Sequence, residues 1–570
     1  MDIYKQTIIA WGVSAFLVCA IQPVWAADPS VEPRVEASVL GPETVAAVQQ
    51  ALDDMEKAAR LLSEEAMGTE SPEKGVSFFV KKVHVQENLL FTEATLAPVV
   101  GPFEGRQQTM RSMQDLADKI TAEYRKRGYL SSQAYIPPQE VKDGVFIINV
   151  VEGRIGQIIF EGNEHYSSAL LGRYCDIHEG DFFTYQQLQK SIVKMNANPD
   201  RLVRAIVRRG SAPGTTDIVF KVEEKGLTHG SVFEDNQGSK PVGQNRLGVG
   251  LRRDNLLGQD DTLRVGGMGG KSFGSAFVEH SLPIAKINSV WKTGVSFAKS
   301  APKKQYKPYG VSSTTMGYWG KLETRLLTDE AVALDWKTGL DLKESRTMFL
   351  SGTNSRERLR VLRFGPTMTV KDAWGGTVIE NQFSLGMETM GAVLYNASSQ
   401  RGGVTPDFFV SDLTVTRMQK MPLKTKLSLK GKAHVSPDKQ PSSEQMALGG
   451  ADTVRGYPEG DYFADEGVLV NAEYLVPFFF LPDTWNMPWS KSRMRDALDI
   501  AFFWDGGYGR FKDPASGQKA SDSLSGAGVG LRARLTDAIY FTTDFAYAIG
   551  ARPNSSDDTF RIHSGMQASW

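Results

Sequence analysis

Few residues of this 570-residue chain have the types and spacing that catalysis needs. Gly270, Ser272 and Gly274 fit the letters of a nucleophilic serine motif, but that motif needs a strand-to-helix turn, and these residues lie in an expected strand hairpin. Gly270-Lys271-Ser272 also matches the end of a phosphate-binding loop, yet Val265 occupies the position of the required first glycine. The seven histidines show no paired spacing typical of a metal site. We therefore expect no catalytic residue, no metal and no cofactor, and the sequence does not predict an enzyme.

Two other short motifs contain residues suited to holding chain segments together. They are V-R-G-Y, formed by Val454, Arg455, Gly456 and Tyr457, and F-W-D-G-G, which includes Phe503, Asp505 and Gly507. Arginine is a permanent cation whose planar guanidinium can donate two parallel hydrogen bonds to one carboxylate. Gly456 allows a tight backbone turn beside a bulky tyrosine.

The first 26 residues have the pattern of a signal peptide. Lys5 precedes an apolar stretch at residues 7–21, and Val24 and Ala26 are small residues at the two positions that a signal peptidase inspects. The alternative is a membrane anchor that stays attached. After cleavage Cys175 is the only cysteine, so the exported chain has no internal disulfide framework. The net charge of -1 gives no reason to expect a nucleic-acid partner.

An amphipathic helix is expected within residues 27–75, between a polar leader and a linker. Pro42 and Glu43 suit the first turn of a helix, and Gly68 stands where its end would be capped. The apolar residues recur at steps of three and four, which places them on one face: Val45, Val48, Leu52, Met55 and Leu62. Such a face can pack against a neighbouring domain or dock inside a groove or lumen, and periodicity does not choose between the two.

Two copies of a small α+β module follow, at residues 76–152 and 153–225. The first has strand patterns at 79–85, 129–136 and 145–151, and a helical stripe from Met113 to Tyr124 that ends near Gly128. About the same order recurs in the second. An internal repeat of this kind defines the unit of folding.

Residues 226–570 alternate polar and apolar side chains over strand-length segments without a domain break. A soluble sandwich and a transmembrane barrel both produce this alternation. The great length of the run, its many aromatic residues and the final Trp570 at the end of a strand favour the barrel. At roughly 20 residues per strand and connection, it would have about 16 strands.

These motifs together resemble one family. The modules are similar to POTRA domains, and Phe160, Glu161, Gly162 and Asn163 resemble the strand-to-helix turn typical of them. The segments 234–238 and 251–260 are similar to the first barrel strands of the outer-membrane transporters of two-partner secretion, the haemolysin secretion/activation type, although Arg252 and Arg253 stand where that family has smaller or uncharged residues. The V-R-G-Y and F-W-D-G-G motifs match the same family.

The resemblance implies an outer-membrane barrel with its POTRA domains in the periplasm. The V-R-G-Y motif would lie on a long loop that folds back into the lumen, where Arg455 would bind Asp505 on the wall. An ordinary lumen ion pair without a gating role is the alternative. The helix at residues 41–68 would be a plug, and the partners would be outer-membrane lipid and a secreted exoprotein, a large β-helical adhesin or haemolysin. The protein would act as a monomer or a weak dimer.

The function implied is export of that unfolded exoprotein through the barrel. The alternative is a factor of the same superfamily that inserts other barrels into the membrane. Lys424, Lys426, Lys430 and Lys432 alternate with apolar residues, and we expect them to form a positively charged strip in the lumen.

Overall fold

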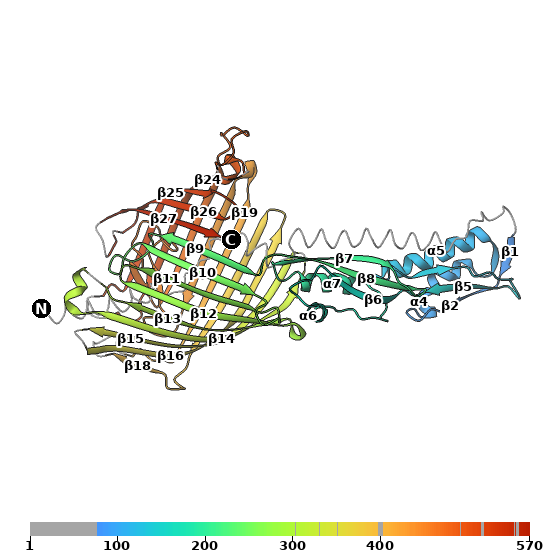
Figure 1. Cartoon of the computed structure of the whole chain (residues 1–570), viewed down its shortest axis with the longest axis horizontal. Helices are drawn as coiled ribbons and strands as arrows, with labels where there is room; N and C mark the ends of the chain where they lie inside the picture. Colours follow the sequence, from blue (N-terminus) through green and yellow to red (C-terminus); the bar gives the residue numbers. More distant parts are fainter. Residues whose placement is uncertain are drawn as a thin grey trace. The chain divides into compact units, whose positions relative to one another are not determined.

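The computed structural model describes residues 77–302, 304–329, 331–349, 352–396, 403–488, 490, 492–514, 518–551, 553–554 and 558–570. The helix expected at residues 41–68, with Val45, Val48, Leu52, Met55 and Leu62, lies outside these ranges, as does the signal peptide. The described residues form two compact units, one within residues 77–226 and the other within residues 227–570. Each unit is described separately below (Figure 1). Among the described residues, no helix is both long and apolar enough to cross a membrane.

The first α+β module forms around helix α5 (Met110–Lys126). Its elements are β1 (Ser77–Val80), β2 (Lys82–Gln86), α4 (Glu93–Val100), β3 (Arg106–Thr109), α5, β4 (Gln133–Tyr135) and β5 (Val145–Val151). Thr109 caps α5: its hydroxyl accepts from the backbone N–H of Ser112, and the Ser112 hydroxyl accepts in turn from the backbone N–H of Thr109. The helix buries Met113, Leu116, Ile120 and Tyr124 against a β2-β5-β4 sheet. The helical stripe predicted from the sequence is therefore the core face, while the first predicted strand is two short strands.

The second module repeats this plan with a β6-β8-β7 sheet. Its elements are β6 (Arg154–Glu161), α6 (Ser168–Gly172), α7 (Tyr185–Met195), β7 (Arg201–Arg209) and β8 (Thr215–Glu224). Strands β6 and β8 run parallel, and α7 buries Leu188 and Ile192. The prediction of two small α+β domains is confirmed.

Apart from the short two-stranded sheet formed by residues 446–448 and 462–464, the remaining strands close into one antiparallel barrel, with β9 paired to β27 (Figure 1). They are β9 (Thr228–Asp235), β10 (Arg246–Asp254), β11 (Thr262–Gly270), β12 (Phe273–Ile284), β13 (Ser289–Ser300), β14 (Ser312–Thr328), β15 (Val332–Phe349), β16 (Gly352–Asp372), β17 (Gly375–Gly386), β18 (Val393–Asn396), β19 (Phe408–Lys420), β20 (Lys426–Val435), β23 (Glu466–Pro477), β24 (Leu498–Arg510), β25 (Ser521–Arg534), β26 (Ile539–Ala548) and β27 (Phe560–Ser569). Strand β18 continues the line of β17 along β16, so the wall has sixteen strand positions. The predicted barrel and its strand number are confirmed.

Alternation along each strand separates an apolar outer face from a polar inner face. On β24 the outward Phe502, Trp504 and Tyr508 are exposed, whereas the inward Phe503 and Asp505 are buried. An antiparallel barrel in lipid needs this arrangement, because every backbone group is paired and only side chains meet the bilayer.

One detail of the expected lysine strip is wrong. Strand β20 begins at Lys426, and Lys424 lies in the preceding turn at Pro422–Lys424, where Leu423 has φ 60°. The Lys424 side chain is largely exposed and lies 3.6 Å from Asp496. Of the four lysines, Lys426, Lys430 and Lys432 lie on the inward face of β20. Because a turn occupies residues 422–424, β20 and its alternation begin only at Lys426 and do not include Lys424.

The serine motif is a tight hairpin, as its setting in the sequence predicts. Gly270 is the last residue of β11 and Phe273 the first of β12, so Ser272 lies in a turn between strands. A nucleophile turn from strand to helix does not form here.

Candidate functional site

The candidate site is a loop at residues 436–465, between β20 and β23, that docks on the inner face of the barrel wall. Its arms pair as a short hairpin, β21 (Met446–Leu448) with β22 (Tyr462–Ala464). Gly449, Gly450 and Gly456 have positive φ angles, which lets the chain turn sharply at the tip. Val454 and Tyr457 are almost fully buried in a cluster with Leu448 and Leu524. The tip is therefore packed as tightly as a protein core.

Arg455 fastens the tip through ion pairs to three strands. Its Nε donates to Asp505 Oδ2 at 2.7 Å and its Nη2 to Asp505 Oδ1 at 2.9 Å, which is a bidentate pair. Its Nη1 donates to Glu473 Oε2 on β23 at 2.7 Å and lies 3.3 Å from Asp544 Oδ2 on β26. The Asp505 side chain is 0% exposed and that of Arg455 is 8% exposed, so this ion pair is buried.

Phe503 supplies the apolar side of this site. The guanidinium carbon of Arg455 lies 3.5 Å from the centre of the Phe503 ring, a cation–π contact beside the ion pairs. Gly528 faces this ring, and a side chain there would overlap it. Gly507 leaves the space that Val454 occupies, because a Cβ at Gly507 would lie 3.0 Å from Val454 Cγ2.

Gly456 and Tyr457 complete the docking. A Cβ at Gly456 would lie 2.7 Å from the backbone of residues 547 and 548, so the backbone of the tip lies against β26 with no room for a side chain at this position. The Tyr457 hydroxyl donates to the carbonyl of Ala551 at 2.7 Å and lies 3.3 Å from the backbone nitrogen of Ser525. These contacts need backbone positions and not particular side chains on the wall.

The charges around Arg455 are unequal in number. Asp505, Glu473 and Asp544 face two guanidinium groups, because Arg532 also binds Glu473 at 2.8 Å and Asp544 at 2.7 Å. Burial alone lowers the pKa of Arg455, but its hydrogen bonds to Asp505 and the nearby carboxylates outweigh burial and raise it further. Arg455 is thus a permanent cation whose removal leaves a net negative pocket.

Glu459 is a titratable group on the same tip. Its Oε1 accepts from the backbone nitrogen of Ala451 at 2.8 Å. Burial, assisted by the charge of Asp452, raises the pKa of the Glu459 carboxyl to about 8. The docked tip therefore favours the protonated form of this side chain near neutral pH.

Sequence reasoning did not find Glu473, Asp544 or Gly526. The two acids occupy inward positions of β23 and β26, so alternation could have placed them in the lumen, but not beside Arg455. Gly526 touches the tip directly, since a side chain there would overlap the carbonyl oxygen of Arg455. The glycines at the alternate positions 526, 528 and 530 of β25 are the sequence feature that could have predicted a close approach of another segment to this strand.

In the α+β unit, residues 160–163 form a tight turn at the end of β6. Gly162 has φ 86°, and a side chain there would overlap the carbonyl oxygen of Val222. Asn163 donates to the carbonyl of Tyr166 at 2.9 Å, and Phe160 stacks on Phe220 at 5.2 Å. A cleft of about 380 Å³ lies beside this turn, lined in part by Glu161, Arg204, Ile206 and Lys221.

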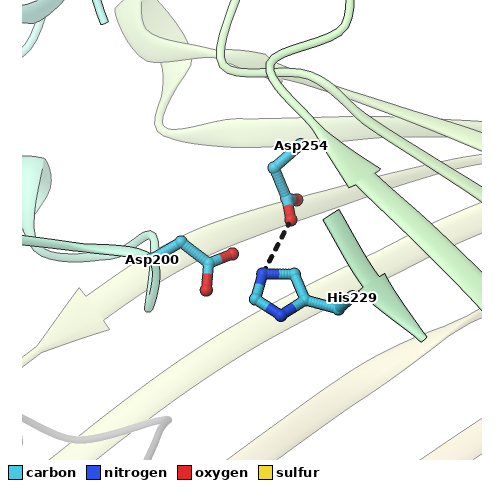
Figure 2. Close-up of side chains that lie close together, drawn as sticks. All are labelled: Asp200, His229 and Asp254. Carbon is cyan, nitrogen blue, oxygen red and sulfur yellow. Dashed lines mark ion pairs between the residues drawn. The ribbon is translucent and has the colours of Figure 1, made fainter. Parts of the chain in front are cut away.

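The first two barrel strands are joined by an ion pair near the point where the barrel begins. His229 Nε2 on β9 lies 3.8 Å from Asp254 Oδ2 on β10 (Figure 2). Asp254 also accepts from Arg252 Nε at 2.8 Å and Thr262 Oγ1 at 2.7 Å, so both of its oxygens have donors. Asp200, the third side chain drawn, belongs to the other unit. Within the described barrel these contacts indicate a structural role for the pair.

The comparisons with known proteins agree on one family. The family described as haemolysin secretion/activation protein ShlB/FhaC/HecB matches residues 214–533, which is more than half of the chain. The ShlB-type POTRA domain matches residues 78–153, and a POTRA family described as surface antigen variable number repeat matches residues 154–225. Similar proteins include the heme/hemopexin transporter protein HuxB of Haemophilus influenzae, 23% identical over 82% of each chain. The outer membrane transporter CdiB of Dickeya dadantii is 22% identical over 76% of this chain and 80% of its own.

Solved structures show the same fold. CdiB from Escherichia coli has a TM-score of 0.65 with 20% identity and covers 93% of this chain and 99% of its own. BamA from Haemophilus ducreyi, a barrel crystallised without its POTRA domains 1–3, has a TM-score of 0.55 with 13% identity, which indicates a shared fold alone. The family match separates this chain from the barrel-insertion alternative. The chain belongs to the haemolysin secretion/activation protein family, the outer-membrane transporters of two-partner secretion, with POTRA domains in the periplasm and a secreted exoprotein as the partner.

Proposed function

We propose that the docked loop tip controls the passage of the exoprotein through the barrel and that Arg455 is the residue that holds it closed. One observation supports this most strongly. A single loop side chain, 8% exposed, binds carboxylates on β23, β24 and β26 inside the lumen. We infer that a polypeptide passes this part of the lumen when the loop moves.

A buried ion pair suits a loop that has one docked position and one released position. Removing one partner of such a pair costs about 3–5 kcal/mol, because the other charge is left buried and unpaired. The docked position is therefore well defined, yet it depends on one residue. If the pair were only structural, Arg455 variants would lose barrel stability and export in parallel.

The POTRA domains would capture the exoprotein by strand addition. Strands β6 and β7 are the outer strands of their sheet, and an extended segment can pair with such an edge. The neighbouring cleft offers Ile206 for apolar contact and Arg204 and Lys221 for charge. Main-chain hydrogen bonds would provide affinity and this cleft would provide specificity.

The exoprotein would be a large β-helical adhesin or haemolysin that folds outside the cell. Folding there would prevent its return and drive export without a nucleotide. The transporter would have no catalytic activity, would act as a monomer or a weak dimer, and would hold its N-terminal helix at residues 41–68 as a plug.

The test is the protein profile of the culture medium from cells with and without the gene, with outer-membrane porin levels measured in parallel. Loss of one very large polypeptide with normal porins supports a dedicated exporter and identifies its partner. Unchanged medium with depleted outer-membrane barrels would contradict it and support the insertion function.

A further inference from the structure

The arm of the loop that leaves β20 has its own set of contacts on another part of the wall. Glu444 receives two hydrogen bonds from Arg363 Nη2 on β16, at 2.9 and 3.1 Å. Arg363 also donates from Nε to Asp341 Oδ2 on β15 at 2.6 Å and from Nη1 to Ser384 Oγ on β17 at 2.7 Å. The Glu444 side chain is 7% exposed. One guanidinium thus joins the loop to three neighbouring strands.

Two further contacts strengthen this attachment. Ser442 Oγ donates to Glu357 Oε1 on β16 at 2.7 Å, and Lys343 Nζ on β15 donates to the carbonyl of Ser443 at 3.3 Å. We call residues 442–444 with Arg363, Asp341, Lys343, Glu357 and Ser384 the base clamp. The Arg455 contacts with Asp505, Glu473 and Asp544 are the tip clamp.

The two clamps lie on different sides of the barrel. Going round the closed wall from β16 to β26, six strand positions intervene in one direction and eight in the other. The base clamp is centred on β16, and the tip clamp extends to Asp544 on β26. The loop therefore bridges two parts of the wall: residues 442–444 are held on β15–β17, whereas Met446, Leu448 and Arg455 pack against β23–β26.

The two ends differ in what their release would leave behind. If the tip detached, Asp505, Glu473 and Asp544 would remain with Arg532 as the one guanidinium that binds them in the described wall. If the base detached, Arg363 would keep Asp341 and Ser384, Glu357 would lose one hydrogen bond from the neutral Ser442, and Glu444 would enter the wet lumen. Three clustered carboxylates left with one guanidinium repel one another, whereas Arg363 keeps a one-to-one pair with Asp341, so release of the base costs less.

We infer that the base clamp is the releasable end of the lumen loop and that Arg363 and Glu444 are positioning residues for export. This inference rests on the proposed function of the loop as a gate. Release at the base detaches residues 442–444 from β15–β17 and frees the lumen beside these strands for the exported chain, while the hairpin and the tip stay docked. The tip remains docked on β24 throughout.

The test is a reversible covalent lock of the base in cells that express the full chain and its exoprotein. Arg363→Cys with Glu444→Cys is made in a Cys175→Ser background and joined by a bis-methanethiosulfonate cross-linker, because the Cα atoms of an arginine–glutamate pair lie too far apart for a direct disulfide. Cross-linking is followed by gel mobility. The Glu444→Cys single variant is the matched control. Ser442→Cys with Glu357→Cys, cross-linked in the same way, provides a second lock if the first pair fails to assemble, because the native Ser442 Oγ and Glu357 Oε1 lie 2.7 Å apart.

We expect a locked base to abolish export, reductant to restore it by cleaving the cross-link, and the reagent to leave export by the single variant unchanged. Undiminished export by a fully cross-linked, assembled lock would overturn the inference and leave the proposed function standing. If neither the wild type nor the reduced variants exported any polypeptide, the proposed function itself would fail.

Discussion

At residue scale, the site combines a fixed cation with a wall built to receive it. Arg455 meets three carboxylates and the face of Phe503, and the backbone around it fits against glycines. Gly526 is the closest of these, because it faces the carbonyl oxygen of Arg455. The fit of the tip depends as much on glycines, which leave space for it, as on charges.

Gly526→Ala should weaken the docked state without changing any charge. Its new methyl group would overlap the Arg455 carbonyl and push the tip off β25. We expect a larger open fraction in planar bilayers. Gly431→Ala is the matched control, since nothing lies within 4 Å of a Cβ there on β20. Equal open fractions for both variants and the wild type would show that close packing of the tip is not needed.

At the scale of elements, the hairpin and the two clamps hold the loop in place. The protonation state of Glu459 affects how strongly the tip docks. The pKa of Glu459 is about 8 in the docked tip, against an ordinary value of about 4.5 when the side chain is exposed. Between these values the docked form binds more protons than the released form. Docking therefore weakens as pH rises through this range.

We expect the wild-type channel to open more often at pH 8.5 than at pH 5.5, measured in planar bilayers. Glu459→Gln keeps the size of the side chain and removes its titration, so its open fraction should change less over the same range. A pH response of equal size in both proteins would assign the effect to other groups.

The lysines of β20 form a second element with a testable property. Lys430 and Lys432 face inward with Lys426, and Lys432 lies 3.2 Å from Asp412. Replacing these three lysines with glutamine should shift the ion selectivity of the channel towards cations, because positive charge is removed from the lumen. Lys424→Gln, in the exposed turn, is the control and should have no such effect. Unchanged selectivity in the triple variant would show that these lysines do not determine the ion selectivity of the channel.

Several of these features could be predicted from the sequence, and others could not. Alternation predicts that Asp505 and Phe503 share the inner face of a strand, and repeat patterns predict the two α+β modules. Which inward residues meet depends on how the strands stagger and how the loop folds. Glu444 and Arg363 are 81 positions apart, and no local pattern connects them. The lysine strip starts at Lys426 and not at Lys424 because of the turn before β20, and the alternation of polar and apolar residues does not predict where that turn lies.

At the scale of the whole molecule, the barrel is closed and the loop spans its interior. Five residue pairs join β27 to β9, against nine between β10 and β11. Trp570 adds two backbone hydrogen bonds with Gly230, both 3.0 Å long. Because the wall is continuous and the described loop lies in its interior, we propose that export is coupled to movement of the loop.

The most direct test of the loop as a gate is export by Arg455→Ala. The amount of exoprotein in the medium is measured beside barrel assembly, followed by heat-modifiable mobility of the outer-membrane protein. We expect export to be abolished or sharply reduced while the barrel still assembles, because the loop loses its defined position and leaves Asp505 unpaired. Arg455→Lys, which keeps the charge but not the bidentate fork, should export an intermediate amount. Wild-type export by the assembled Arg455→Ala variant would contradict a functional role for the tip clamp.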